Sequence, residues 1–226
     1  MSALRLRETC RYPGLGRASA GHVVFVHGLW LSGRESLVLR RRLARQFGFR
    51  VHRFPYRTLA CSMAEITGRL HSFVRALASP CVHLVGHSLG GLVIYRFLER
   101  YPEQPGGRVV FLGTPCRPSR VAREATHYRL LASLMGHSVA AELVRSRERH
   151  WTMTRDLGII AGTQPVGVGR LLTHFEEECD GTVAVSETRL PGAKDHIALH
   201  VSHLGMLMSA RVARETGLFL RDGRFS

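Results

Sequence analysis

The sequence predicts an α/β protein in which helices cover both faces of a sheet of about six mostly parallel strands. Short apolar runs rich in valine, isoleucine and phenylalanine alternate along the chain with longer segments whose apolar residues have helical spacing. No internal repeat, low-complexity tract or long linker interrupts this alternation, and a chain of 226 residues can bury one sizeable core. We therefore expect a single domain over residues 1–226.

The expected strands are short and lie well apart in the chain. They cover residues 23–26, 50–54, 82–85, 109–112, 157–161 and 196–200. The spacing of apolar residues predicts helices between and after them, over residues 34–47, 63–78, 89–101 and 204–216. Because strands and helices alternate, right-handed crossovers should bring the strands together in a doubly wound sheet.

One connection is much longer than the others. Residues 119–149 have a helical pattern throughout and join the fourth expected strand to the fifth. A connection of this length exceeds what a crossover needs. We expect it to form a small helical cap or flap beside the functional site.

The composition is that of a soluble protein, with 45% hydrophobic and 22% charged residues. No apolar run reaches the roughly 18 residues of a membrane-spanning helix, and the charged N-terminus has no signal-peptide pattern. The cysteines are odd in number, and neither they nor the histidines have metal-ligand spacing, so we expect no metal site. This pattern favours a reducing compartment in which thiols stay free, and we expect a cytoplasmic protein. The cysteines are Cys10, Cys61, Cys81, Cys116 and Cys179.

The chain is strongly basic, with a formal net charge of +15. Lys194 is the only lysine among the 32 basic residues, and the arginines are spread along the chain. The densest run, Arg40-Arg41-Arg42 with Arg45, lies on the expected helix 34–47, where we interpret it as the solvated face. We therefore expect no nucleic-acid partner. The basic surface also fits a weak association with anionic membrane surfaces.

A serine between two glycines follows the third expected strand. The motif Gly86-His87-Ser88-Leu89-Gly90 comes directly after the apolar run 82–85 and directly before a helical segment. This is the context of a nucleophile elbow, whose abrupt turn exposes the serine hydroxyl and leaves no room for side chains two residues away. We therefore assign Ser88 as a nucleophile.

Attack on an acyl carbon also needs hydrogen-bond donors for the oxygen that becomes negatively charged. The expected strand 23–26 ends in His27-Gly28-Leu29, where the glycine lets the backbone approach closely. We expect the amides of Leu29 and of Leu89, the residue after the nucleophile, to form this oxyanion hole. His27 precedes the serine in the chain, and we interpret it as a residue that orients the loop.

The acid that supports the catalytic base follows the nucleophile in architectures with such an elbow. Of the four aspartates, Asp156 and Asp195 begin expected strands, whereas ligands bind at the carboxyl ends of strands. Asp222 lies in what we expect to be a C-terminal tail, beyond every histidine. Asp180 lies in a polar turn that follows strand 157–161 and its connecting segment. We therefore assign Asp180 as the acid.

Three histidines follow Asp180 and are candidates for the base. His196 and His200 fall within the last expected strand and share one of its faces, where we interpret them as core or sheet-surface residues. His203 follows that strand, where a loop opens a helix. Because this position lets its imidazole reach over the sheet toward Ser88, we assign His203 as the base.

These motifs together resemble the α/β-hydrolase superfamily and, more narrowly, small bacterial lipases and the lipase-like relatives of the GPI inositol-deacylase. The resemblance implies ester hydrolysis, with Ser88, Asp180 and His203 matching the triad. In those lipases a histidine or Arg-Gly-Ser often follows the Leu-Gly-Thr-Pro turn, whereas Cys116-Arg117 follows here. The matching segments are Val26-His27-Gly28-Leu29, Gly86-His87-Ser88-Leu89-Gly90-Gly91, Leu112-Gly113-Thr114-Pro115, Asp180-Gly181-Thr182-Val183 and Ser202-His203-Leu204.

We therefore expect a serine hydrolase that cleaves carboxylic esters through an acyl-enzyme and needs no cofactor. Trp30 and Leu31 follow the oxyanion loop, and as pocket walls they favour an apolar acyl group of a small-molecule or lipid ester. An acyltransferase or thioesterase with the same triad is the alternative within enzymes. A non-catalytic protein that binds an anionic partner through its arginines is the alternative of another class. The oligomeric state stays open.

Overall fold

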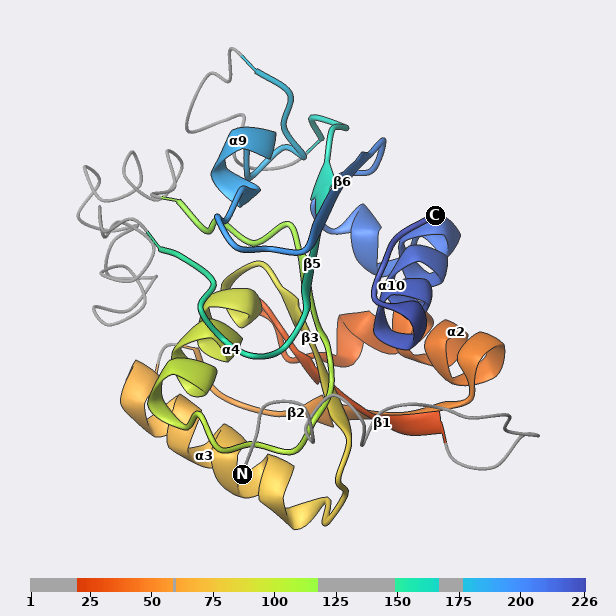
Figure 1. Cartoon of the computed structure of the whole chain (residues 1–226). Coiled ribbons are helices and arrows are strands. Elements are labelled where there is room, and N and C mark those ends of the chain that lie inside the picture. The colour runs from red at the N-terminus through yellow and green to blue at the C-terminus, as the bar shows by residue number, and fades with distance from the viewer. Residues whose placement is uncertain (1–19, 59, 118–148, 167–176) are drawn as a thin grey trace.

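In the part of the chain that the structure describes, six parallel strands form one sheet (Figure 1). The computed structural model describes residues 20–58, 60–117, 149–166 and 177–226. Within them the strand order is β2-β1-β3-β4-β5-β6, and every neighbouring pair is parallel, which confirms the predicted fold class. The strands are β1 Ala20–Val26, β2 Phe49–Phe54, β3 Val82–His87, β4 Val109–Leu112, β5 Leu157–Gly162 and β6 Asp195–Leu199.

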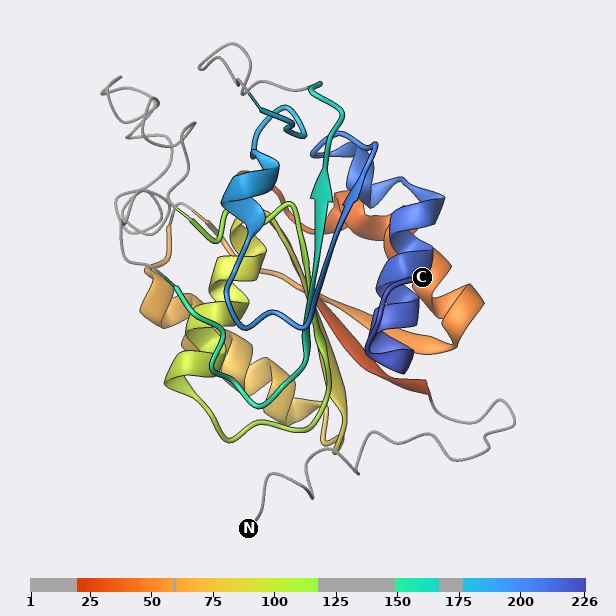
Figure 2. The same cartoon turned by 45° about the horizontal axis from the view of Figure 1, so that its top comes forward.

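Helices cover both faces of the sheet. Helices α2 and α10 pack together on one face, and α3 and α4 pack together on the other, as Figure 2 also shows. The chain enters at β1, moves to the edge strand β2 and then crosses to the far side of β1, so α2, before this reversal, lies on the opposite face from α3 and α4, which directly follow it. The helical elements are η1 Arg34–Ser36, α2 Leu37–Phe47, α3 Met63–Ala76, α4 Leu89–Arg100, α9 Val185–Thr188, η2 Gly205–Leu207 and α10 Ala210–Asp222.

Strand β1 shows why the central strands are apolar throughout. Val24 and Val26 contact the helical layer on one face, whereas Val23 and Phe25 contact the layer on the other. A strand that is covered on both faces buries every side chain, which produces an unbroken apolar run rather than an alternating one. All four side chains are buried.

The last predicted helix differs most from the structure. Segment 204–216 divides into the short 3-10 turn η2 and the longer helix α10, which begins after Ser209 and continues to Asp222. The hydroxyl of Ser209 accepts a hydrogen bond from the Val212 amide at 3.3 Å and caps α10. Phe219 extends the buried face of α10 beyond residue 216. The expectation that Asp222 lies in a C-terminal tail is therefore wrong.

The predicted cap over residues 119–149 lies outside the described residues, except for Arg149. The guanidinium of Arg149 is buried, and its Nη1 donates a hydrogen bond to the carbonyl oxygen of Cys116 at 3.0 Å. The helical cap stays a prediction.

The cysteines differ from the expectation that all thiols stay free. Cys61, Cys116 and Cys179 are not disulfide-bonded, whereas Cys81 is. Disulfide formation depends on distance in the folded chain, which the scattered spacing in the sequence does not reveal. The expectation is therefore wrong at Cys81, and the cysteines no longer support a cytoplasmic location, which stays a prediction. Among the described helices, none has the length and apolar character to cross a membrane.

Candidate active site

Ser88 lies in an abrupt turn between β3 and α4, as the sequence predicts for a nucleophile elbow. Its backbone has φ 54° and ψ −124°, a conformation that residues other than glycine rarely adopt. A Cβ atom on Gly86 would lie 2.5 Å from the Gly91 nitrogen, so the turn leaves no room for a side chain there. The Ser88 amide donates to the Leu112 carbonyl at 2.9 Å, and the Thr114 hydroxyl donates to the Ser88 carbonyl at 3.0 Å. These bonds hold the serine backbone against the end of β4.

The first turn of α4 also contacts the end of β1. A Cβ atom on Gly90 would lie 2.1 Å from the Val26 carbonyl oxygen, and one on Gly28 would lie 3.1 Å from the Ser88 Cβ atom. Only glycines allow two backbones to approach this closely. The loop after β1 therefore lies directly beside the serine.

Leu29 and Leu89, the two predicted oxyanion donors, belong to these two contacting segments. Leu89 is the first residue of α4, where a helix has no internal acceptor for the amide. Leu29 follows Gly28, and in the described part of the chain its amide makes no hydrogen bond. Trp30 has a positive φ of 58°, and its amide donates to the Thr58 hydroxyl at 3.4 Å. Its ring is exposed, and Leu31 is half-buried.

His27 holds the loop after β1 in place. Its Nδ1 lies 2.9 Å from the Gly28 carbonyl oxygen, which can only accept, so Nδ1 carries the proton. The Tyr56 hydroxyl donates to the His27 carbonyl at 2.6 Å, and the two rings stack with centroids 4.1 Å apart. Burial lowers the pKa of His27, against the hydrogen bond to Gly28, which raises it. These contacts are those of a loop-orienting residue.

Asp180 and His203 form a buried pair at the carboxyl edge of the sheet. The His203 Nδ1 atom lies 2.6 Å from Asp180 Oδ2, and the His203 amide donates to the Asp180 carbonyl at 2.9 Å. The other carboxylate oxygen, Oδ1, accepts from the amides of Thr182 at 2.9 Å and Val183 at 2.7 Å. A Cβ atom on Gly113 would lie 2.9 Å from Oδ2 and 3.1 Å from Nδ1, so a glycine is required beside the pair.

Ser88 and this pair both contact the carboxyl end of β4. The Ser88 amide is bonded to Leu112, the residue before the glycine that faces the pair. His87, which precedes Ser88, has its Nε2 atom 2.9 Å from the His203 carbonyl oxygen. Among the described residues, which include both groups, no hydrogen bond joins the Ser88 hydroxyl to the His203 imidazole. Such bonds are often long in enzymes without substrate, and this one stays a prediction.

The aspartates rejected from the sequence have structural partners elsewhere. Asp156 Oδ2 pairs with the Lys194 ammonium at 2.8 Å and with Arg108 Nε at 3.4 Å. Asp195 Oδ2 accepts a hydrogen bond from the Phe225 amide at 3.0 Å. Both residues lie at the beginnings of strands, away from the turn at Ser88.

The rejected histidines also lie away from the pair. His196 is half-buried in β6, with its Nε2 atom 2.8 Å from the Thr188 hydroxyl. His200 is exposed and lies just beyond the end of β6 rather than within the strand. Among the described residues, no hydrogen bond joins either histidine to Asp180.

The roles of His87, Gly113 and Thr114 did not follow from the sequence. His87 occupies a variable position of the elbow motif, so the motif itself gives no reason to single it out. Gly113 and Thr114 belong to the turn after β4, whose contacts with Ser88 and with the Asp180–His203 pair arise only in three dimensions. The shared position of all three at strand ends is the one signal that the sequence offers.

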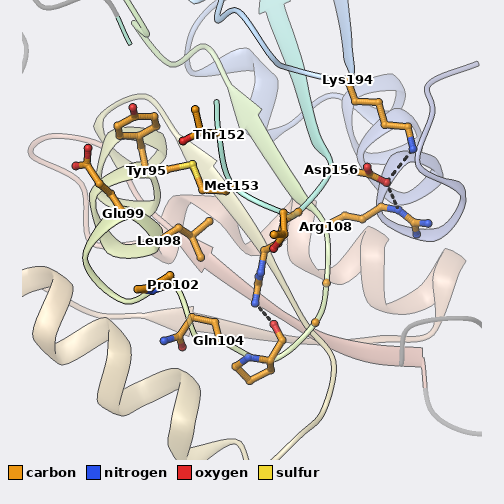
Figure 3. Close-up of a pocket in the computed structure, with 15 residues that line it drawn as sticks. Tyr95, Leu98, Glu99, Pro102, Gln104, Arg108, Thr152, Met153, Asp156 and Lys194 are labelled. Atoms are coloured by element: carbon orange, nitrogen blue, oxygen red, sulfur yellow. Dashed lines mark hydrogen bonds and ion pairs between the residues drawn. The ribbon is translucent and has the colours of Figure 1, made fainter. Parts of the chain in front are cut away.

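A cavity of about 540 Å³ lies at the end of the sheet where β4 and β5 begin (Figure 3). Arg108 and Asp156 line it and directly precede β4 and β5, whereas Ser88 directly follows β3. Its apolar wall consists of Tyr95, Leu98, Pro102, Pro105 and Met153.

The charged groups of this cavity are engaged in structural contacts. Arg155 donates from Nη1 to the Val82 carbonyl at 3.0 Å and from Nη2 to the Pro105 carbonyl, and burial lowers its pKa to about 10. The dashed lines in Figure 3 also mark the pairing of Asp156 with Lys194 and Arg108. The cavity therefore does not contribute to the site around Ser88.

The protein thus combines a parallel sheet, a serine in a strained turn after β3, and a buried aspartate–histidine pair at the carboxyl ends of the strands. Residues 23–215 match the alpha/beta hydrolase family, and the chain belongs to that family. No curated protein sequence matches it.

Solved structures of three bacterial proteins have similar folds at low identity. Lipase BlEst2 from Bacillus licheniformis, in its mature form, has a TM-score of 0.72 at 21% identity over 93% of this chain and 94% of its own. Phospholipase PlaB from Legionella pneumophila, in complex with thio-NAD, has a TM-score of 0.66 at 16% identity over 87% and 56%. Carboxylesterase CesB from Bacillus subtilis has a TM-score of 0.54 at 15% identity over 91% and 85%. At these identities the likeness concerns the fold.

Proposed function

We propose that this protein is a serine hydrolase that cleaves carboxylic esters, with Ser88 as nucleophile, His203 as base and Asp180 as the carboxylate that orients the base. The observation that carries the proposal is the buried contact of 2.6 Å between His203 Nδ1 and Asp180 Oδ2, beside the turn that presents Ser88. Because Nδ1 donates to the carboxylate, the neutral ring has its lone pair on Nε2, the nitrogen that a base uses.

The reaction begins when His203 Nε2 accepts the proton of the Ser88 hydroxyl while the serine oxygen bonds to the acyl carbon. The amides of Leu29 and Leu89 stabilise the negative charge that develops on the carbonyl oxygen. The intermediate collapses, and the leaving alcohol takes the proton from His203. Water then attacks the acyl-enzyme while His203 accepts a proton from it. Transfer of this proton to the Ser88 oxygen releases the carboxylic acid product and restores Ser88. No step requires a cofactor.

An ester as the substrate agrees with the neighbours of this fold, which include a lipase, a phospholipase and a carboxylesterase. Trp30 and Leu31 lie beside the oxyanion loop and favour an apolar acyl group. We therefore propose small-molecule or lipid esters as substrates.

The test uses p-nitrophenyl butyrate hydrolysis together with a fluorophosphonate probe. We expect the wild type to turn over the ester and to form a covalent adduct at Ser88, with release of fluoride. Ser88→Ala should lose about a thousandfold or more of kcat/KM and all labelling. Ser72→Ala, which removes an exposed hydroxyl on α3, is the matched control and should keep both.

Two results separate the alternatives. Equal rates for wild type and Ser88→Ala, with no adduct, would contradict the hydrolase and favour the alternative of a non-catalytic protein that binds anions. Labelling of Ser88 with acyl transfer to an added alcohol or thiol, in preference to water, would identify an acyltransferase.

A further inference from the structure

His87 is a buried imidazole that contacts the base directly. It is the last residue of β3, its side chain has no exposed surface, and its ring centroid lies 4.7 Å from that of His203. Its Nε2 atom lies 2.9 Å from the His203 carbonyl oxygen. A carbonyl oxygen can only accept, so Nε2 carries the proton and Nδ1 carries the lone pair.

The second nitrogen of His87 keeps the ring neutral. Nδ1 is buried and has no hydrogen-bond partner, and a Cβ atom on Gly28 would lie 3.3 Å from it. A proton on Nδ1 would find no acceptor there. Burial, reinforced by the neighbouring His203, lowers the pKa of His87 to about 3. The ring is therefore a neutral donor over the pH range in which a histidine base works.

This donor completes the support of the base loop. The amide and the Nδ1 atom of His203 both bond to Asp180, whereas the carbonyl of His203 accepts from His87, 116 residues earlier in the chain. His87 is also the residue that immediately precedes Ser88. One hydrogen bond thus joins the nucleophile turn to the loop that carries the base.

We propose that His87 is a positioning residue that fixes the loop of His203 relative to the turn of Ser88. This inference rests on the proposed function, because it assigns His203 the role of base. The role requires a donor that stays uncharged, since a cation at 4.7 Å would oppose the imidazolium that forms on His203 during attack. The other titratable groups that face His87 are Asp180 and His27.

Two substitutions separate the donor from the bulk of the side chain. His87→Leu fills the space but cannot donate, whereas His87→Gln places an amide N–H near the position of Nε2. We expect His87→Leu to lower kcat about 10- to 100-fold with KM nearly unchanged, because small displacements of a catalytic group cost this much. We expect His87→Gln to recover most of the loss.

The pH–rate profile distinguishes positioning from a loss of folded protein. Without the bond from His87, the contact of His203 with Asp180 loosens, and the carboxylate stabilises the imidazolium less. Protonation of the base then requires lower pH, so the acidic limb for His87→Leu should move to lower pH, and the limb for His87→Gln should not. A smaller folded fraction would lower the rate and leave the limb in place.

His83→Leu is the matched control. His83 is also fully buried in β3, burial also lowers its pKa to about 3, and its Nδ1 accepts from the Arg108 amide at 2.9 Å far from the turn. We expect His83→Leu to reduce stability. The acidic limb of its pH–rate profile should stay in place, and its kcat should be unchanged when the rate is divided by the amount of Ser88 that the fluorophosphonate probe labels.

The outcomes are distinct. If the wild type hydrolyses the ester and labels at Ser88 but His87→Leu keeps its kcat and its acidic limb, the positioning role is wrong. It is also wrong if His87→Gln is as impaired as His87→Leu, or if His83→Leu shifts the limb equally. If the wild type neither labels nor turns over substrate, the proposed function itself is wrong.

Discussion

A buried carboxylate needs other groups to replace the water that it loses on folding. Asp180 obtains three, because its oxygens accept from the amides of Thr182 and Val183 and from the imidazole of His203. Two of these donors belong to the backbone and cannot rotate away. Asp180 is therefore held in one orientation, and it selects the tautomer of the histidine before any substrate arrives.

Buried neutral histidines make the stability of this protein depend on pH. The pKa of His83 falls from 6.5 to about 3 on folding, mainly through burial. Below pH 6.5 this histidine binds a proton in the unfolded chain but not in the folded chain. Its contribution to stability is therefore complete above pH 6.5 and is lost as the pH falls toward 3. His83→Leu should therefore flatten the pH dependence of the free energy of unfolding by up to about 1.4 kcal/mol per pH unit.

Urea unfolding of both proteins at several pH values between neutral and mildly acidic measures this slope. Parallel pH dependences for wild type and His83→Leu would contradict the prediction. His87 titrates in the same direction and remains in both proteins, so the comparison isolates His83.

The candidate site was predictable where chain order and strand position restrict the choice. Ser88 follows from its motif, and Asp180 and His203 follow from elimination among few residues of the same type. His87 was not predictable, because its partner is 116 residues away and the contact is made to a backbone oxygen. Every residue type has a backbone carbonyl, so the residue type at position 203 does not indicate that its carbonyl accepts this bond.

At the scale of elements, the packing of α4 on β1 depends on Gly90. Its Cβ atom would lie 2.1 Å from the Val26 carbonyl oxygen and 2.6 Å from that of His27, so Gly90→Ala forces the helix away from the strand. We expect a loss of about 1–3 kcal/mol in the free energy of unfolding. Ester hydrolysis should fall as well, because Leu89 moves with the helix.

Gly68 provides the matched control for this substitution. It lies inside α3, and its Cβ atom would meet only the Tyr101 hydroxyl at 3.6 Å. Gly68→Ala should therefore raise stability by up to about 1 kcal/mol through helix propensity. Urea unfolding measures both variants, and a Gly90→Ala protein as stable as the wild type would refute the steric argument.

The elements themselves were predictable because the apolar patterns are long and regular. Their ends were less so, as α10 shows: residues 205–207 form a separate turn, and the helix starts where Ser209 can cap it. Capping depends on which backbone amides lie near the side chain, and several serines and glycines of the sequence are equally suited. The apolar period alone does not choose among them.

At the scale of the whole molecule, positive charge and exposed apolar residues suit an anionic lipid surface. The net charge is +15, and Trp30, Leu204 and Met208, which are 56%, 58% and 59% exposed, follow strands at the carboxyl edge of the sheet. We expect the protein to sediment with phosphatidylglycerol vesicles at low salt. It should be released near 1 M salt, where the Debye screening length is about 3 Å. Equal sedimentation with phosphatidylcholine vesicles would contradict this expectation.

The topology was also predictable, since alternating strands and helices with right-handed crossovers allow few arrangements. The disulfide at Cys81 was not, because an odd set of scattered cysteines gives no distances. Neither was the position of the cavity beside Arg108 and Asp156, which depends on how loops meet at the end of the sheet where β4 and β5 begin.

Under the proposed function, the strained backbone of Ser88, with φ 54° and ψ −124°, lowers stability at the very residue that turnover requires. A residue with a side chain holds this conformation at a cost of about 1–3 kcal/mol, whereas glycine adopts it freely. Replacing the serine by glycine would therefore relax the turn and remove the hydroxyl in one change. Under the proposed function, selection for heat resistance alone would enrich variants without esterase activity, so such a selection has to measure ester hydrolysis in the same round.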